Sequence, residues 1–260
     1  MSVIDDKETE RRRYDDRAFS LGQRRSHLAG GGRGSEAVPL WLREPYSAYE
    51  RLIGENCGPG STVLELGAGT GEFSEAALLA GAHLVATDIS SKSLSLAAER
   101  YVWAGERFAA LAADMERIPF DGGRFDMVTS AGSLSYGDNF AVLRGVHRVL
   151  RPGGVFVCVD SLNHNPIYRL NRWVHFRRGR RTRSTLERMP TLRLIEEYRK
   201  TFGEVEVRFF GGAAWVMPFA ARLFGNEFTA ELSGRIDRFF RVRQSAFKFV
   251  MLARKGRFQS

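Results

Sequence analysis

The chain has 260 residues, of which 43% are hydrophobic and 27% are charged, a composition that supports a folded core and argues against extensive disorder. Its net charge of +9 comes from 39 Lys and Arg against 30 Asp and Glu, so we expect attraction to an anionic partner, whether nucleic acid, acidic lipid or an acidic substrate. The two cysteines, Cys57 and Cys158, have no CxxC neighbour, which argues against a metal site and predicts reduced thiols in a cytoplasmic protein.

No secretory signal or membrane span is expected. The first twenty residues are charged and contain no apolar stretch of the kind that a signal peptide needs. The longest apolar candidate, residues 209–224, is interrupted by Gly211, Gly212, Pro218 and Arg222, and falls short of the ~18 apolar residues of a spanning helix.

The N-terminal segment, residues 1–35, is polar and ends in a glycine-rich stretch over residues 30–34. This composition predicts a flexible arm in front of a main domain over residues 36–260. Tyr14 and Phe19 are the side chains with which the arm could dock on the domain as a flap. The alternative is a frayed terminus, and the sequence leaves both open.

From residue 40 the chain alternates between helical and strand patterns. Apolar residues at helical spacing predict a first helix over residues 40–54, which the Cys57-Gly58-Pro59-Gly60 stretch ends. We then predict strands over residues 62–66, 83–87, 108–112, 125–129 and 155–160, and helices over residues 73–79, 90–101 and 140–150, with Ser90 as an N-cap and a tight turn at residues 151–154. Such alternation predicts an α/β fold with a parallel sheet and helices on both faces.

The pattern changes after residue 160. Residues 161–200 are polar, rich in arginine and predicted to be helical. Residues 204–210 and 246–253 alternate like strands, with a mostly helical segment, residues 211–242, between them. We therefore expect a helical lid over residues 161–245 that carries the acceptor region.

The central feature is a glycine loop that follows the first predicted strand and opens a helix, with Gly67, Ala68, Gly69 and Gly71 in the spacing GxGxG. Glycines at this position let a ligand approach the backbone closely. Dinucleotide-binding loops have the spacing GxGxxG instead. Glu65 stands two residues before the first glycine, where its carboxylate would repel a pyrophosphate. A cationic nucleoside without phosphate, such as S-adenosylmethionine (SAM), suits this loop better.

Two further carboxylates follow the next two strands. Asp88, with Ile89 beside it, is placed to accept hydrogen bonds from ribose hydroxyls, and Asp114 is placed to accept one from an adenine amino group. Met115 would lie against the adenine ring. Because ligands bind at the carboxyl edge of parallel sheets, we expect these residues to meet Glu65 there. Taken singly, each acid could equally be a solvated loop residue or a helix cap.

At these residues the sequence resembles the class I SAM-dependent methyltransferases, in the subgroup that includes the ubiquinone and menaquinone methyltransferases. The resemblance covers residues 45–160 and rests on several motifs: Glu65–Gly71, Asp88, Asp114-Met115 with Ile118-Pro119-Phe120, Phe125–Val128 and Arg151–Gly154. It implies a Rossmann-like sheet of seven strands with the last one antiparallel, SAM as cofactor, and a cofactor contact at Ser130, which follows the fourth strand. The segments Ser161–Arg169 and Ser245–Val250 resemble methyltransferases of bacterial polysaccharide and sugar pathways.

The residues after the fourth strand, Ser130 to Tyr136, lack the Asn-Pro-Pro-Phe type motif that marks amino-group methylation in related families, which favours an oxygen acceptor. His164 is the preferred general base, since its unperturbed pKa lies near neutral pH; the alternative is a structural histidine. The candidate acceptor-binding residues lie past the fourth and fifth strands: Tyr136, Asn163, Tyr168, Arg169 and Arg172. The arginines of residues 169–183 suit an anionic acceptor or lipid surface, or they form a solvated basic face.

The leading hypothesis is O-methylation of a small molecule or saccharide. A quinone or lipid-like acceptor, with peripheral membrane contact, is the first alternative. RNA methylation is the second, although no aromatic-basic RNA-binding module stands outside the predicted domain, so no nucleic acid partner is expected. A SAM-binding protein without catalytic activity is a third. The sequence does not decide the oligomeric state.

Overall fold

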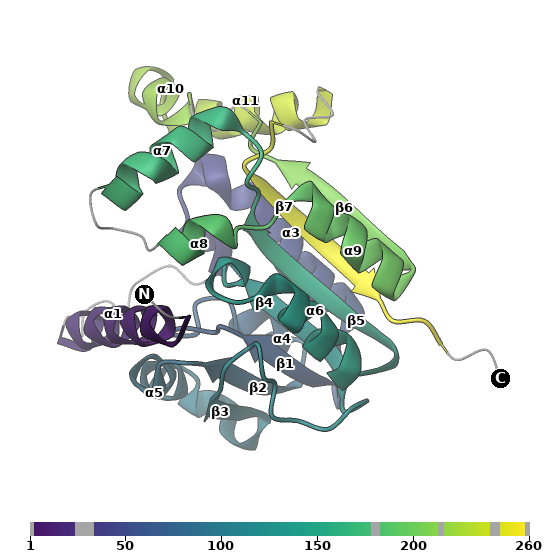
Figure 1. Ribbon diagram of the computed structural model, residues 1–260. Helices are drawn as coiled ribbons and strands as arrows, with labels where there is room; N and C mark the ends of the chain where they lie inside the picture. Colours follow the sequence, from purple (N-terminus) through teal and green to yellow (C-terminus); the bar gives the residue numbers. More distant parts are fainter. Residues whose placement is uncertain (1–2, 24–33, 178–182, 213–215, 240–244, 258–260) are drawn as a thin grey trace.

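The computed structural model describes residues 3–23, 34–177, 183–212, 216–239 and 245–257 (Figure 1). Its strands are β1 (Thr62–Leu66), β2 (His83–Asp88), β3 (Phe108–Ala112), β4 (Phe125–Ala131), β5 (Leu150–Ser161), β6 (Glu204–Phe210) and β7 (Lys248–Arg254). Its α-helices are α1 (Val3–Gln23), α3 (Leu40–Asn56), α4 (Glu75–Leu79), α5 (Ser91–Arg100), α6 (Asn139–Val149), α7 (Pro166–Arg177), α8 (Arg183–Glu187), α9 (Leu192–Phe202), α10 (Met217–Phe224) and α11 (Asn226–Phe239). Three short 3-10 helices complete the fold, namely η1 (Gly34–Ala37), η2 (Val102–Arg107) and η3 (Leu134–Tyr136).

The seven strands form one sheet in the order β3-β2-β1-β4-β5-β7-β6. The first five of these strands are parallel, and β7 runs antiparallel to both of its neighbours, β5 and β6. The expected class, an α/β Rossmann-like sheet of seven strands whose last strand is antiparallel, is therefore confirmed. Because β2, β1 and β4 are neighbours and run parallel, the loops that follow these three strands open at the same edge of the sheet.

Helices cover both faces of the sheet, because successive side chains of a strand point to opposite sides. On β1, Leu64 packs with α6 and α9 on one face, and Val63 packs with α3 and α4 on the other. Strand β5 divides in the same way, with Phe156 facing α9 and Val157 facing the α3 side. Buried strands of this kind carry continuous apolar runs, which is why the sequence predicted them well.

Side-chain caps fix where several helices begin. The Ser90 hydroxyl accepts a hydrogen bond from the Ser93 amide at 3.0 Å, so the predicted N-cap of α5 is confirmed. Asp138 caps α6 through the Phe140 and Ala141 amides, and the Thr191 hydroxyl caps α9 through the Leu194 amide. Each cap satisfies amide groups that have no partner within their own helix.

The predicted tight turn at residues 151–154 lies within β5 and not before it, as an irregular start of that strand. The pairing of β4 with β5 shifts register between Phe125 and Met127. The Gly153 amide donates to the Lys255 carbonyl, and the Lys255 amide donates to the Gly154 carbonyl, both at 2.9 Å. The backbone is therefore held by the residue after β7, a partner far away in the sequence.

The structure also differs from the expected flexible arm, since Val3–Gln23 form the helix α1, which packs against α5 (Figure 1). Ala18 of this helix is buried and Glu10 is only 5% exposed. Tyr14 packs edge-on against the Tyr136 ring with a centroid distance of 5.5 Å, whereas Phe19 stands in solvent. The boundary near residue 35 between an arm and a main domain stays a prediction.

The insertions that flank β6 are helical, as expected for the lid region. Helices α7, α8 and α9 lie between β5 and β6 in the chain, and α10 and α11 lie between β6 and β7. In the part of the chain that the structure describes, no helix is both long enough and apolar enough to cross a membrane.

Candidate cofactor and acceptor site

A cavity of about 370 Å³ opens at the carboxyl edge of the sheet. Gly67 follows β1, Ile89 follows β2, Ala113 follows β3 and Gly132 follows β4, and all four line it. Other lining residues come from α1, α3, η3 and α8, among them Lys7, Glu10, Tyr14, Ala18, Tyr46, Ser135, Tyr136, Ser184 and Thr185. The parallel strands thus supply the floor of the cavity, and elements outside the sheet supply the cover.

The glycine loop needs its glycines for two different reasons. At Gly67 the backbone φ is +65°, and a Cβ atom would lie 2.4 Å from the Ser133 Cβ. At Gly71 the φ is +75°, and a Cβ atom would lie 2.8 Å from the Tyr101 ring. Gly67 lines the cavity, whereas Gly71 lets the loop pack on α5, where the Tyr101 hydroxyl donates to the Gly71 carbonyl at 2.6 Å.

Glu65 is a buried carboxyl group in the wall of the cavity. Burial raises its pKa to about 7, and a hydrogen bond donated by the Ser74 hydroxyl opposes that rise. The negative charges of Glu72 and Asp88 raise the pKa further. A ligand that carries a positive charge into this cavity would favour the ionised form of Glu65.

Asp88 holds the glycine loop in place and keeps capacity for a ligand. One carboxylate oxygen accepts a hydrogen bond from the Gly69 amide, and the other accepts one from the Ser90 amide, both at 2.9 Å. Because each carboxylate oxygen has two lone pairs, both oxygens can accept one more hydrogen bond each. Burial raises the pKa of Asp88, against the lowering effect of these amides. A pair of ribose hydroxyls matches the remaining capacity.

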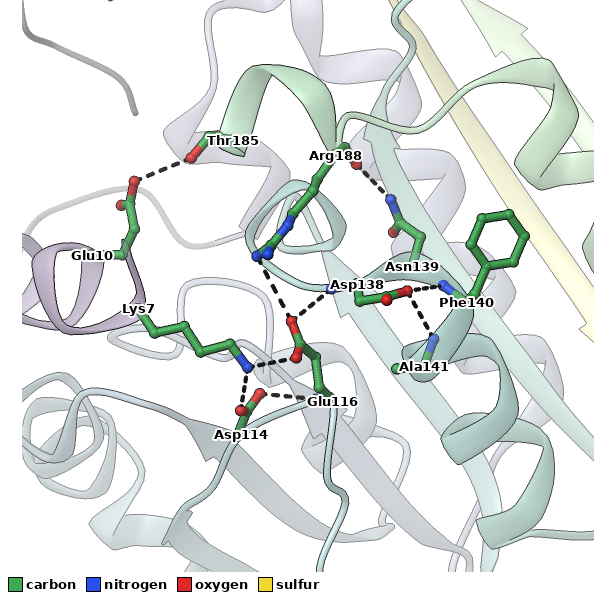
Figure 2. Close-up of polar contacts among 10 residues, drawn as sticks. All are labelled: Lys7, Glu10, Asp114, Glu116, Asp138, Asn139, Phe140, Ala141, Thr185 and Arg188. Carbon is green, nitrogen blue, oxygen red and sulfur yellow. Dashed lines mark hydrogen bonds and ion pairs between the residues drawn. The ribbon is translucent and has the colours of Figure 1, made fainter. Parts of the chain in front are cut away.

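Asp114 also lines the cavity, and it belongs to a cluster of charges that joins α1 to the loop after β3 (Figure 2). The Lys7 ammonium group contacts Asp114 at 2.5 Å and Glu116 at 2.6 Å. The other oxygen of Glu116 lies 3.8 Å from the Arg188 guanidinium group and accepts a hydrogen bond from the Asp138 amide at 2.7 Å. Glu116 therefore connects α1, the start of α6 and the residue that follows α8.

A second contact joins α1 to α8 across the cavity. The Thr185 hydroxyl donates to the Glu10 carboxylate at 3.1 Å, and both side chains are buried (Figure 2). Beside them Tyr14 packs on Tyr136, and burial together with the Tyr136 hydroxyl raises the pKa of Tyr14 well above its ordinary value. The Tyr14 hydroxyl is therefore held in its neutral form and is hydrogen-bonded to Tyr136.

The structure brings most of the predicted cofactor residues together. The predicted residues that line the cavity are Glu65, Gly67, Ala68, Gly69, Asp88, Ile89, Asp114 and Met115. Gly71 and Ser130 are not among the lining residues; the buried Ser130 hydroxyl lies 2.7 Å from that of Ser133, which does line the cavity. A part of these two residues in cofactor binding stays a prediction. Gly71 would act indirectly through the conformation of the glycine loop, and Ser130 would act through Ser133.

The predicted acceptor residues are more scattered. Tyr136 lines the cavity, but in the described part of the chain His164, Asn163, Tyr168 and Arg169 do not. Tyr168 is buried against the Phe247 ring at 4.3 Å, and Arg169 is exposed. His164 is partly buried, and its Nδ1 atom has no hydrogen-bond partner among the described residues. The side chain of Arg172 lies outside the described residues.

Sequence reasoning assigned no ligand-binding role to the face of α1 that covers the cavity. Lys7, Glu10, Tyr14 and Ala18 line it, and their spacing of three, four and four residues places them on one side of a helix. That spacing is visible in the sequence, although it is hidden among many charged residues. The sequence around Thr185 and Arg188 contains no comparable pattern that would predict their place in the cavity lining.

Comparison with known families agrees with this geometry. Residues 63–154 match the family described as Methyltransferase domain. A demethylmenaquinone methyltransferase of Streptomyces griseus is 37% identical over 124 residues, which are 47% of this chain and 50% of that protein. A demethylmenaquinone methyltransferase of Mycolicibacterium gilvum is 35% identical over 161 residues, which are 60% of this chain and 59% of that protein. The chain thus matches little more than half the length of these relatives.

Solved structures share the fold at low sequence identity. Phosphoethanolamine N-methyltransferase 2 of Haemonchus contortus, in a complex with S-adenosyl-L-methionine, matches with a TM-score of 0.62 and 18% identity over 94% of this chain and 57% of that chain. A geranyl diphosphate methyltransferase in complex with geranyl diphosphate and sinefungin matches with a TM-score of 0.57 and 18% identity, covering 82% of this chain and 79% of that chain. These likenesses support the arrangement of the sheet.

Proposed function

We propose that this chain, which has the domain and the fold of a class I SAM-dependent methyltransferase, transfers a methyl group from SAM to a quinone-like or other lipid-like acceptor. The observation that carries the cofactor assignment is the meeting of Glu65, Asp88 and Asp114 in one cavity beside a glycine loop that has no room for a side chain at Gly67. Carboxylates at successive strand ends suit a cationic nucleoside without phosphate.

Each of these groups has a distinct part in holding the cofactor. Asp88 would accept the ribose hydroxyls with its free lone pairs, and Glu65 would face the positive charge of the methionine end. Asp114 and Met115 would hold the adenine. SAM supplies an electrophilic methyl group when it is bound, so the protein has mainly to position the acceptor and to exclude water.

The acceptor side is formed by Tyr14, Tyr136 and Thr185, which α1, η3 and α8 bring to the same cavity. At about 370 Å³ the cavity lies near the lower end of the ~300–1,000 Å³ that ligand pockets occupy. A cofactor therefore fills much of it, and the acceptor approaches along the wall of α1 and α8. His164 lies outside the cavity lining, so as a general base it would act on an acceptor that extends beyond this lining.

The choice of a quinone-like acceptor rests on the relatives, since two that match over about half or more of their length are demethylmenaquinone methyltransferases. O-methylation of a saccharide, which the sequence favoured, has no such support. We keep it as the alternative, in which the arginines of residues 169–183 would meet an anionic sugar.

Methyl transfer from labelled SAM tests the proposal directly. The purified protein would be supplied with a short-chain quinol, with a sugar nucleotide and with no acceptor, and labelled product would be separated by polarity. We expect label in the quinol fraction and formation of adenosylhomocysteine. Label confined to the sugar nucleotide would replace the proposed acceptor, and tighter binding of NAD than of adenosylhomocysteine would overturn the cofactor assignment.

A further inference from the structure

Large apolar side chains stand in solvent on three helices of the lid region. They are 48% to 77% exposed, and they are Leu170 and Trp173 on α7, Phe219, Leu223 and Phe224 on α10, and Phe228 on α11. Figure 1 places all three helices at the same end of the molecule, the end farthest from β3. Exposed apolar groups that gather in this way mark an interaction surface.

On α10 and α11 these side chains form a continuous strip. Phe219 and Leu223 are four residues apart, so they lie on one face of α10, while Met217 and Ala220 of the same helix are buried. The Phe224 ring lies 5.7 Å from the Phe228 ring across the junction between the two helices. Helix α10 therefore has one face in the protein and an apolar face that no other described element covers.

Positive charge accompanies the apolar groups. Neither α7 nor α10 contains an Asp or Glu residue. Arg169, Arg177 and Arg222 are exposed on these helices, and the Arg177 guanidinium group lies 4.9 Å from the centre of the Trp173 ring. One exposed acidic residue, Glu227, lies within the strip, between Phe224 and Phe228 in the first turn of α11. Trp, Phe and Leu together with Arg form the composition of helices that lie in a bilayer interface.

We propose that α7, α10 and the first turn of α11 dock this protein on the surface of an anionic lipid bilayer. The apolar strip would enter the boundary between headgroups and acyl chains, and the arginines would meet lipid phosphates. This proposal rests on the proposed function: docking on the bilayer would let the enzyme take a lipid-like acceptor from it. It requires no spanning helix.

The charge pattern favours a lipid surface over a second copy of the chain. In a symmetric dimer each patch meets the same patch of its partner, so Arg169, Arg177 and Arg222 of both copies would be brought close together. Glu227, in the first turn of α11, is the acidic residue that this surface offers against them. An anionic membrane instead offers apolar depth and negative charge in adjacent layers, which matches both features of the patch.

Flotation of the whole protein with vesicles tests the proposal. Vesicles of phosphatidylcholine alone would be compared with vesicles in which about 30% of the lipid is phosphatidylglycerol. The second kind gives the surface a negative charge of the order found in natural membranes. We expect the wild type to float with the anionic vesicles and to be released by high salt. Changing Phe219→Ser and Leu223→Ser together should lower vesicle affinity at least about tenfold, and Arg222→Gln should lower it about fivefold.

The matched control is Leu79→Ser with Val102→Ser, which also removes two exposed apolar side chains, 71% and 80% exposed, but from α4 and η2. Absence of binding to anionic vesicles, or an equal loss of vesicle affinity in the control variant, would overturn the proposal. It would also be overturned if light scattering showed that the wild type and the control are dimers and that the Phe219→Ser, Leu223→Ser variant is a monomer. Calorimetry with adenosylhomocysteine on the same samples separates the two proposals. A protein that binds vesicles but not the cofactor keeps the docking surface and loses the proposed function.

Discussion

Glu65 is a carboxyl group whose burial raises its pKa to about 7, which makes it sensitive to any charge that enters the cavity. A bound cation stabilises the ionised form and lowers this pKa. Binding is therefore linked to loss of a proton when the pH is below about 7. Asp88 faces the same cavity with a raised pKa of its own, so the two groups must be separated by substitution.

The pH dependence of SAM affinity should reveal this linkage. We expect affinity to rise with pH by up to about tenfold per unit below neutrality and to level off above the pKa of Glu65, since one proton is released. In Glu65→Gln the affinity should be lower and its pH dependence largely lost. Calorimetry over pH 5 to 9 in two buffers of different ionisation enthalpy would measure both. If the variant keeps the slope of the wild type, the titrating group is Asp88.

Removal of the Asp88 carboxylate should weaken SAM binding strongly. Asp88→Ala loses hydrogen bonds between a charged acceptor and the ribose, each worth roughly 1.5–3 kcal/mol. We expect affinity to fall at least about tenfold by calorimetry, while Asp121→Ala, at an exposed position, leaves it unchanged. Equal affinity in wild type and Asp88→Ala would remove Asp88 from the site.

The crowding at Gly67 can be tested apart from its backbone conformation. Gly67→Ala and Gly60→Ala both place a side chain at a positive φ, +65° and +82°, but only the first meets a neighbour, the Ser133 Cβ at 2.4 Å. Gly60→Ala should lose roughly 1–2 kcal/mol of stability in thermal unfolding, and Gly67→Ala should lose more because of the clash with Ser133. Only Gly67→Ala should also lose cofactor binding, and adding Ser133→Gly should restore part of it. Normal binding by Gly67→Ala would show that the loop shifts without consequence.

At the scale of elements, α1 is held over the cavity by polar contacts with residues far along the chain. Lys7 and Asp114 are 107 residues apart, and Glu10 and Thr185 are 175 residues apart. Ion pairs with partial exposure contribute little each, typically ~0–1 kcal/mol, so the docking of α1 depends on several of them acting together.

Lys7→Ala should loosen α1. Two carboxylates, Asp114 and Glu116, then lose their shared cation, and we expect faster proteolysis within α1 and faster release of adenosylhomocysteine, by about fivefold. Arg12→Ala is the control, since Arg12 is 76% exposed and pairs with Glu8 of the same helix. Stopped-flow displacement and timed digestion measure the two effects. Identical behaviour of the two variants would mean that Lys7 does not hold α1 in place.

At the scale of the whole molecule, the antiparallel strand β7 joins the edge strand β6 to β5 and completes the core. Phe249 is fully buried on this strand, opposite Asp160 of β5 and Phe209 of β6. Phe249→Ala leaves a cavity and should cost about 3–5 kcal/mol of unfolding free energy, which lowers Tm by about 10 °C. Phe140→Ala, at a side chain 44% exposed, should lower Tm far less in circular dichroism melts. A similar Tm for both would contradict the burial of Phe249 in the core.

The order of strands and helices could be read from the chain, because the alternation of short apolar runs with helical patterns is a local property. The strands predicted over residues 62–66, 108–112 and 204–210 have the observed bounds. The irregular start of β5 could not be read, since the glycines of residues 151–154 look like a turn until Lys255 pairs with them.

By itself the sequence determined the parallel strands, the glycine loop and the carboxylates that meet at the edge of the sheet, because strand periodicity and the convergence of parallel strand ends place them. The antiparallel end of the sheet was implied by the resemblance to a known family. Only the tertiary structure decided that α1 and α8 cover this edge, that His164 lies outside the cavity lining and that α10 leaves an apolar face in solvent. The physical reason is distance along the chain. Contacts such as Lys7 with Asp114 join segments whose own patterns carry no sign of each other.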